Sequence, residues 1–247
     1  MIFSQPIDLW DRIVNRLELW RDSPDTVASA DAISLEDALV QAGVLLGRDL
    51  SVIARDPELK TIRDMIAAAP EPAFARTYDA NNSLSMLCYV LCRALAPASV
   101  VETGVANGAT STYLLAALSH APDGRLYSVD WMPGGARRRT PVGELVPDDL
   151  RGRWTLEAGP SRRLLAPLLR RIEPPSLFLH DSAHTYRNMR RELETVTPFL
   201  GRPGVVLVDD VQANASFDAW ASAARPTYAR RVATELPGHQ VGMAIFA

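Results

Sequence analysis

Five short apolar segments that alternate with helical segments constrain the fold of this chain more than any other feature of its sequence. Strands are expected at Ser99–Glu102, Arg125–Asp130, Trp154–Glu157, Leu177–Asp181 and Val205–Asp209. Helices are expected after them, at Ala109–Ser119, Arg162–Arg171, Tyr186–Phe199 and Ala215–Ala224. Nearly continuous apolar strands that alternate with helices are typical of a parallel sheet covered by helices on both faces.

The end of the chain departs from this alternation. Two further strands are expected at Tyr228–Glu235 and Gln240–Ala247, and only four residues join them. So short a connection excludes a helical crossover and predicts an antiparallel hairpin. The chain is therefore expected to form an α/β fold with a doubly wound, seven-stranded sheet. That sheet is mostly parallel and has one antiparallel strand near its edge.

The first part of the chain, up to about residue 97, is expected to be helical. Apolar residues recur at helical spacing from Ile7 to Trp20, and Ser34 is expected to cap the next helix. Further helices are expected at Pro57–Ala69 and Ser83–Leu95. We expect two domains: a helical extension over 1–82, which forms a cap or a dimer surface, and a ligand-binding domain over 83–247.

The composition limits the classes of molecule that the chain is expected to bind. The 247 residues carry a formal net charge of −3, so no basic field favours nucleic acid. No apolar run reaches the ~20 residues that a membrane-spanning helix needs. The first residues lack the pattern of a signal peptide, so a cytoplasmic location is expected. Cys88 and Cys92 are expected to be buried thiols rather than a metal or redox pair. The expected partner is therefore a small-molecule substrate, and neither nucleic acid nor a membrane is expected to bind. A homodimer is left as an open expectation.

The turn after the first strand, residues 102–108, is the expected ligand-binding segment. Gly104 permits a tight turn, and Gly108 permits a close approach of backbone and ligand. Open α/β sheets bind ligands at the carboxyl ends of their strands, and the acid that ends the next strand, Asp130, suits the two hydroxyls of a ribose. The alternatives are a turn without a ligand for the glycines, and a helix cap or solvated acid for Asp130.

Three acids follow the fourth and fifth strands: Asp181, Asp209 and Asp210. If those strands are neighbours, their ends lie about 5 Å apart. Three converging carboxylates repel one another unless a cation joins them, and oxygen ligands suit a hard ion such as Mg²⁺. The alternative is that Asp209 and Asp210 cap the following helix.

Two histidines flank the first of these acids. His184 is placed to take a proton from a substrate hydroxyl at neutral pH, although a helix cap or a core residue is equally compatible with its position. His180 is expected to be a core histidine. Asn214 is expected to cap the helix that begins near Ala215.

The glycine turn, the acid at the second strand end and the terminal hairpin together resemble the class I S-adenosylmethionine-dependent methyltransferases. The resemblance covers residues 83–247 and implies a Rossmann-like sheet of strand order 3-2-1-4-5-7-6. It implies that Glu102 faces the methionine end of S-adenosyl-L-methionine, that Asp130 holds the ribose and that Trp131 borders the adenine. The full set of implied cofactor-binding residues is Glu102, Thr103, Gly104, Asn107, Gly108, Asp130, Trp131, Gly159, Ser161 and Asp181. Pro160 stands where the family often has an acid, so that contact with adenine is not expected.

Within this family, the acids and His184 resemble the metal-dependent small-molecule O-methyltransferases of the macrocin and catechol types. Residues 180–186, His-Asp-Ser-x-His-Thr-Tyr, are similar to those of a bacterial subgroup. The resemblance implies that Asp181, Asp209 and Asp210 bind the metal, and that His184 with Asp181 is catalytic. The implied reaction is O-methylation of a hydroxyl on a secondary metabolite or sugar.

Other functions remain open on the same residues. A metal-free N- or O-methyltransferase with His184 as base is one. A nicotinamide-dependent oxidoreductase shares the first turn, and a relative of the cephalosporin-hydroxylase type shares the Asp-Ser-x-His portion. The loop over 131–149 is expected to contact the substrate, and its Arg137-Arg138-Arg139 run either binds an anionic group or is a solvated charge run.

Overall fold

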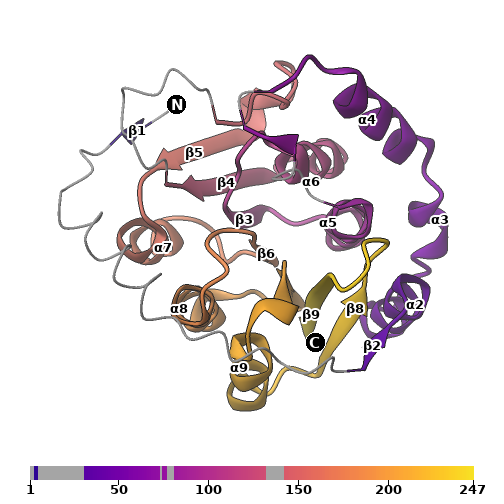
Figure 1. The fold of residues 1–247 in the computed structure, drawn as a ribbon, viewed down its shortest axis with the longest axis vertical. Helices are drawn as coiled ribbons and strands as arrows, with labels where there is room; N and C mark the ends of the chain where they lie inside the picture. Colours follow the sequence, from indigo (N-terminus) through magenta and orange to yellow (C-terminus); the bar gives the residue numbers. More distant parts are fainter. Residues whose placement is uncertain (1–2, 5–30, 73, 77–80, 132–141) are drawn as a thin grey trace.

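A computed structural model describes residues 3–4, 31–72, 74–76, 81–131 and 142–247 (Figure 1). The expected helix from Ile7 to Trp20 and the Arg137-Arg138-Arg139 run lie outside the described residues. None of the helices in the described ranges is long and apolar enough to cross a bilayer.

One mixed sheet forms the centre of the molecule. Its seven main strands are β3 (Ser99–Thr103), β4 (Arg125–Asp130), β5 (Trp154–Ala158), β6 (Leu177–His180), β7 (Gly204–Val208), β8 (Tyr228–Ala233) and β9 (Gln240–Phe246). Their order across the sheet is β5-β4-β3-β6-β7-β9-β8, and β9 runs antiparallel to both of its neighbours. The predicted order 3-2-1-4-5-7-6 is therefore confirmed.

Two short strands extend the sheet beyond the predicted seven. β1 (Phe3–Ser4) pairs with β5, and β2 (Ala32–Ile33) pairs with β8, both in parallel. They correct the expectation that the first part of the chain is helical throughout. Strands of two residues carry no periodic pattern, and they form because the outer edges of β5 and β8 offer unpaired backbone groups.

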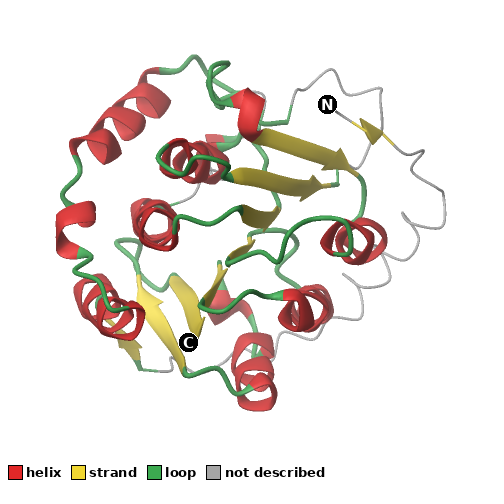
Figure 2. Cartoon of the chain, turned by 180° about the vertical axis from the view of Figure 1, so that it is seen from behind, coloured by secondary structure: helices red, strands yellow, loops and turns green. Residues whose placement is uncertain are grey.

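Helices cover both faces of the sheet, in two layers on one face and in a single layer on the other (Figures 1 and 2). On one face, α5 (Asn82–Leu95) and α6 (Ala109–Ser119) lie inside an outer arc of α2 (Leu35–Leu46), α3 (Ser51–Ala54) and α4 (Pro57–Ala68). On the other face lie α7 (Ser161–Leu169), α8 (Tyr186–Val196) and α9 (Ser216–Ala224). Single-turn 3-10 helices occupy Arg151–Arg153, Thr197–Phe199 and Val211–Ala213.

Each face of the sheet has its own apolar core, because successive strand residues point to opposite sides. In β3, Val100 packs into the core beneath α5 and α6, whereas Val101 packs beneath the helices of the other face. The expected capping is present as well: the Ser34 hydroxyl accepts the backbone N–H of Asp37 at 3.0 Å and starts α2.

The turn after β3 makes the closest backbone contact that positions the site. Gly104 has φ +86°, and a Cβ atom at this position would overlap the carbonyl group of Asp181 and lie 2.8 Å from the amide nitrogen of Ser182. Directly beside it, the N–H of Asp181 donates to the carbonyl of Thr103 at 2.8 Å. The ends of β3 and β6 are thus held together, and only glycine fits at residue 104.

We expect Gly104→Ala to lower the free energy of unfolding by about 2–6 kcal/mol, since it adds left-handed strain to a steric overlap. Thermal or urea denaturation measures the loss. Gly152→Ala is the matched control, because a Cβ there meets nothing within 4 Å. Equal stability of the two variants would show that the turn adapts to a side chain.

Candidate active site

The loop from Gly104 to Gly108 is braced by the acid predicted to meet a ribose. Oδ2 of Asp130 accepts the backbone N–H groups of Val105 at 2.8 Å and Ala106 at 3.0 Å. Burial raises the pKa of Asp130, and these two hydrogen bonds oppose the shift. Asp130 therefore sets the shape of the loop. Its contact with a ribose stays a prediction.

Glu102 lies behind this loop rather than on its surface. The side chain has no solvent exposure, and its carboxylate accepts hydroxyl hydrogen bonds from Thr110, Ser111 and Ser128 at 2.7–3.0 Å. Burial raises its pKa to about 7, although the three hydroxyls oppose the rise. Glu102 thus ties β3 to the start of α6 and to β4, and its predicted contact with the methionine end of a cofactor stays a prediction.

Two more of the predicted cofactor residues make contacts that build the loop. The side-chain amide of Asn107 donates to the carbonyl of Phe74 and accepts its N–H, both at 3.1 Å. The hydroxyl of Thr103 donates to Glu192 at 2.5 Å. These contacts join the loop to the segment before α5 and to α8.

The remaining predicted cofactor residues follow β4 and β5 at the same edge of the sheet. The N–H of Gly159 donates to the carbonyl of Asp130 at 2.8 Å, and Ser161 begins α7. The ring of Trp131 is half-buried beside the guanidinium of Arg162, and its buried Nε1 finds no acceptor among the described residues. Their predicted place beside an adenine stays a prediction.

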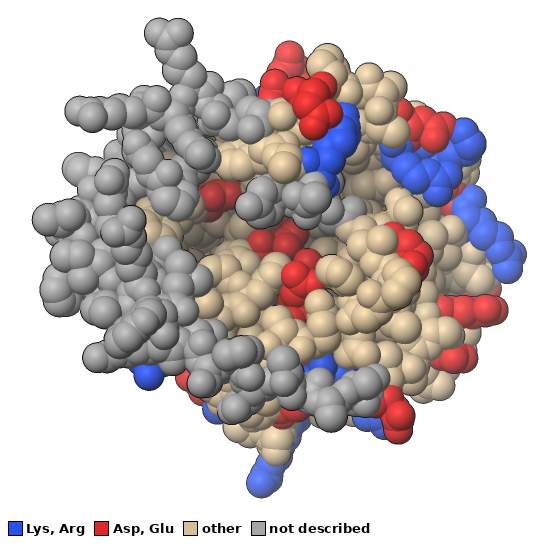
Figure 3. Space-filling model, viewed as in Figure 1, with Lys and Arg blue, Asp and Glu red and all other residues tan. Residues whose placement is uncertain are grey.

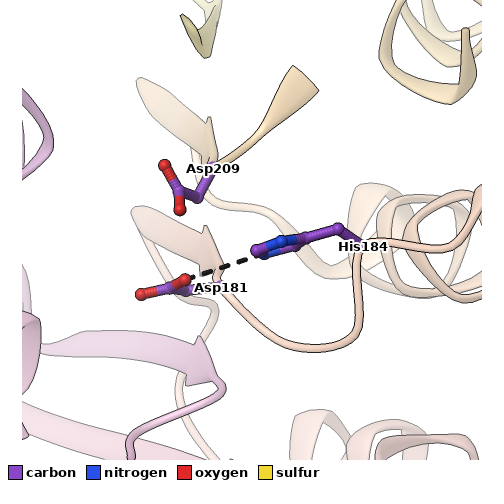
Figure 4. A group of neighbouring side chains, drawn as sticks. All are labelled: Asp181, His184 and Asp209. Atoms are coloured by element: carbon purple, nitrogen blue, oxygen red, sulfur yellow. Dashed lines mark ion pairs between the residues drawn. The ribbon is translucent and has the colours of Figure 1, made fainter. Parts of the chain in front are cut away.

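Two of the three predicted metal ligands converge with the predicted base. Asp181, His184 and Asp209 each direct one ligand atom into a common space, and these atoms lie within 4.8 Å of one another (Figure 4). The acids come from the ends of the neighbouring strands β6 and β7, which the hydrogen bond from Asp209 N–H to the carbonyl of His180 aligns at 2.9 Å.

The third predicted ligand, Asp210, lies on the other side of the imidazole. Its backbone is left-handed, with φ +51°, and this ends the extended run of β7. Its carboxylate contacts Nδ1 of His184 at 2.9 Å, Nδ1 of His239 at 3.1 Å and the amide of Gln212 at 2.8 Å. Asp210 therefore orients His184 instead of joining the group in the centre.

The charges of this group depend on one another. Burial lowers the pKa of His184, but the carboxylates of Asp181 and Asp210 outweigh it and raise that pKa to about 10. Burial and the charges of Asp181 and Asp210 raise the pKa of Asp209. The imidazolium hydrogen bond holds the pKa of Asp210 well below its usual range, against burial. The acids on both sides of His184 therefore favour its protonated form.

The surroundings of the Nε2 atom of His184 show whether a metal ion fits this group of side chains. The atom is buried, has no hydrogen-bond partner among the described residues and lies 3.7 Å from Oδ1 of Asp181. A histidine that contacts a carboxylate through one nitrogen and leaves the other free toward two acids has the arrangement of a metal ligand with its orienting partner. The donor set therefore fits a divalent cation.

A buried polar network beneath this group was missed by sequence reasoning. Glu192 contacts Nδ1 of His180 at 2.6 Å and accepts from Ser182 and Asn188 at 3.0 and 3.1 Å. Burial raises the pKa of Glu192, but His180 and the hydrogen bonds lower it to about 2. His180 is buried as expected, while its acidic partner lies two turns into α8. The spacing of Asn188 and Glu192, two polar residues on the inward face of α8, was the available signal.

Asn214 behaves as the predicted cap. Its Oδ1 accepts the N–H of Ser216, the first residue of α9, at 2.9 Å. Its amide donates to the carbonyl of His184 at 3.0 Å, so the same side chain also holds the loop of the histidine.

Comparison of the sequence with known proteins relates these features to a family. Residues 101–211 match the family model described as a methyltransferase domain. Over this part of the chain, the protein is similar to the methyltransferases. The predicted resemblance to the class I S-adenosylmethionine-dependent methyltransferases is thus confirmed, and the end of β3, all of α6 and the acids after β6 and β7 lie within the matched residues.

Solved structures share the fold of this methyltransferase. The O-methyltransferase from Bacillus cereus, in complex with SAH, is 17% identical with a TM-score of 0.58, over 78% of this chain and 92% of that one. TomG, an O-methyltransferase from Streptomyces achromogenes involved in tomaymycin synthesis and solved with SAM, is 16% identical with a TM-score of 0.51, over 85% and 96% of the two chains. No curated protein sequence matches the chain.

The free energy of unfolding of this protein should depend on pH through the titration of Glu102. Its pKa of about 7 lies above the ordinary glutamate value of 4.5, so the folded state keeps a proton that the unfolded chain releases. Stability from this group is complete below about pH 4.5 and is lost as the pH rises through 7. Relative to wild type, Glu102→Gln should therefore gain about 1–3 kcal/mol between pH 4.5 and 8.

Urea denaturation across this pH range measures the difference. Glu173→Gln, a change at an exposed position, serves as the control and should follow wild type at every pH. Parallel curves for Glu102→Gln and wild type would contradict the buried, proton-holding glutamate.

Proposed function

We propose that this methyltransferase transfers the methyl group of S-adenosyl-L-methionine to a hydroxyl oxygen of a small molecule, with a divalent cation at Asp181, His184 and Asp209. One observation carries the proposal: the metal-like group of side chains opens at the same sheet edge as the glycine loop of a methyltransferase domain. In such a reaction, the oxygen–carbon bond forms as the sulfur–carbon bond breaks, and the hydroxyl proton, which the cation would make more acidic, passes to water.

The surroundings of the group favour a hydroxylated acceptor without a negative charge. Acidic side chains lie in a hollow near the middle of this face of the molecule (Figure 3). A carboxylate or phosphate would be repelled there unless a cation precedes it. A bound cation would supply a Lewis acid that holds a hydroxyl or diol and lowers its pKa. The proposed acceptor is therefore a secondary metabolite or a sugar with free hydroxyls.

The nature of the cation follows from the donor set. Three carboxylates would favour Mg²⁺, the ion expected from the sequence. With an imidazole in place of the third carboxylate, Mn²⁺, Fe²⁺ or Zn²⁺ becomes the better match. His184 cannot be both a ligand and a base through the same Nε2, so the proposal assigns it to the cation.

The cofactor is tested by calorimetric titration with S-adenosylhomocysteine. Binding is expected, and Asp130→Ala should weaken it at least about tenfold, because the brace of the loop and the acceptor for the ribose are both lost. Asp123→Ala, an exposed acid before the start of β4, is the control. Binding of NAD without binding of S-adenosylhomocysteine would instead identify a nicotinamide-dependent enzyme.

The cation is tested by titrating chelator-treated protein with Mn²⁺. One ion per chain is expected, and His184→Ala and Asp209→Asn should each weaken its binding at least about tenfold. Asp149→Asn, at an exposed position, should not change it. In parallel, methyl transfer from labelled cofactor to hydroxylated acceptors should stop after chelation and return with the ion.

Methyl transfer that survives both chelation and Asp209→Ala would contradict the metal. If the same activity were lost in His184→Ala, the second candidate would stand: a metal-free methyltransferase with His184 as its base. Its support is the position of Nε2, which faces the same space as the two acids.

A further inference from the structure

A half-exposed histidine at the tip of the hairpin between β8 and β9 contacts the acid that lies behind the central group of Asp181, His184 and Asp209. Nδ1 of His239 lies 3.1 Å from Oδ1 of Asp210. The other carboxylate oxygen, Oδ2, lies 2.9 Å from Nδ1 of His184. An ionised carboxylate only accepts hydrogen bonds, so both ring nitrogens that face it carry hydrogens. Asp210 therefore links two histidines that lie far apart in the sequence.

The two oxygens of the Asp210 carboxylate have separate partners. Oδ1 contacts the ring of His239 and accepts from the side-chain amide of Gln212 at 2.8 Å. Oδ2 is directed toward His184. The carboxylate cannot rotate without breaking both contacts on the hairpin side. The direction of Oδ2 toward the imidazole is therefore set by the partners of Oδ1.

The hairpin holds His239 in place through its backbone. The N–H of His239 donates to the carbonyl of Leu236 at 3.1 Å, and its carbonyl accepts the N–H of Thr234 at 3.3 Å. The next residue, Gln240, donates its N–H to the side chain of Gln212 at 2.9 Å. The hairpin thus supplies the histidine and also supports the other group that binds the same carboxylate oxygen.

Contacts on two sides fix the hairpin against the rest of the chain. Arg231 in β8 is 3% exposed, and its guanidinium donates to the carbonyl of Val211 at 2.8 Å. On the other side, the carboxylate of Glu235 accepts the N–H of Ser83, at the start of α5, at 3.1 Å (Figure 1). The position of His239 is therefore determined by the packing of the hairpin, although its own side chain is 47% exposed.

An exposed ion pair between a histidine and an acid usually adds little to stability. The backbone of Asp210 indicates a different role for this one. Its φ of +51° is left-handed, and a residue other than glycine keeps that conformation only where its contacts over-determine it. The contacts that do so here come from the hairpin on one side and from His184 on the other.

We propose that His239 is a positioning residue of the candidate active site. It holds the carboxylate of Asp210, which in turn holds the ring of His184 with Nε2 toward the two acids of the central group. The inference rests on the proposed function, because the direction of Nε2 matters only if that atom binds a cation or takes a proton. Both roles need a lone pair on Nε2, and a hydrogen on Nδ1 that Asp210 accepts leaves it there.

Titration of chelator-treated protein with Mn²⁺ measures the effect on the cation. His239→Ala should raise the dissociation constant about tenfold, because the loss of a group that orients a metal ligand weakens metal binding. His239→Asn should restore most of the affinity, since its side-chain amide offers a donor in place of Nδ1. His120→Ala is the matched control: this histidine is 45% exposed and pairs with Glu58 at 2.9 Å in the outer layer. It should bind Mn²⁺ like wild type, and circular dichroism checks that each variant is folded.

Crystal structures of metal-free wild type and of His239→Ala distinguish this inference from the proposed function. The contact between Asp210 and His184 should be present in wild type and lost in the variant, with the rest of the hairpin unchanged. Wild type that binds no Mn²⁺ would contradict the proposed cation, and the two structures would still decide the role of His239. An unchanged His184 ring in His239→Ala would overturn that role. Wild-type affinity for Mn²⁺ in His239→Ala would overturn it as well, and so would a loss in His239→Asn as large as in His239→Ala.

Discussion

The close contact between the backbones of Gly104 and Asp181 determines where the two halves of the candidate active site meet. A side chain at residue 104 would separate the ends of β3 and β6, and with them the cofactor loop and the acids. Because the contact is made by backbone atoms, it sets the distance between the two halves without depending on a flexible side chain. The brace from Asp130 then shapes the rest of the loop around this point.

Several titratable side chains of the site are buried, and each of them contacts polar or charged side chains. The carboxylate of Glu102 is surrounded by hydroxyls, Glu192 by a histidine and polar side chains, and His184 by acids on both sides. Burying such groups costs several kcal/mol apiece unless their partners are well placed. An arrangement of this cost contributes little net stability, and its result is a rigid orientation of the side chains at this edge of the sheet.

The outer helices are joined to the catalytic part at several points. Asn107 of the cofactor loop binds the backbone of Phe74, and the carboxylate of Glu235, after β8, accepts the N–H groups at the start of α5. The phenol of Tyr89 contacts Asp56 and Glu58 at the start of α4. Of these contacts, the one between Asn107 and Phe74 reaches the loop directly.

The sequence by itself determined the strands, the terminal hairpin, the glycine turn and the strand-end acids Asp130, Asp181 and Asp209, and its resemblance to the methyltransferases implied the order of the strands. Hydrophobic periodicity and strand ends are local properties, and the carboxyl ends of parallel strands always share one edge. Only the tertiary structure decided that His184 stands in the central group and Asp210 behind it. That choice depends on one left-handed residue, and on His239 from a hairpin distant along the chain. The partner of His180 and the two-residue edge strands were decided in the same way, because their contacts form only when segments far apart in the sequence pack together.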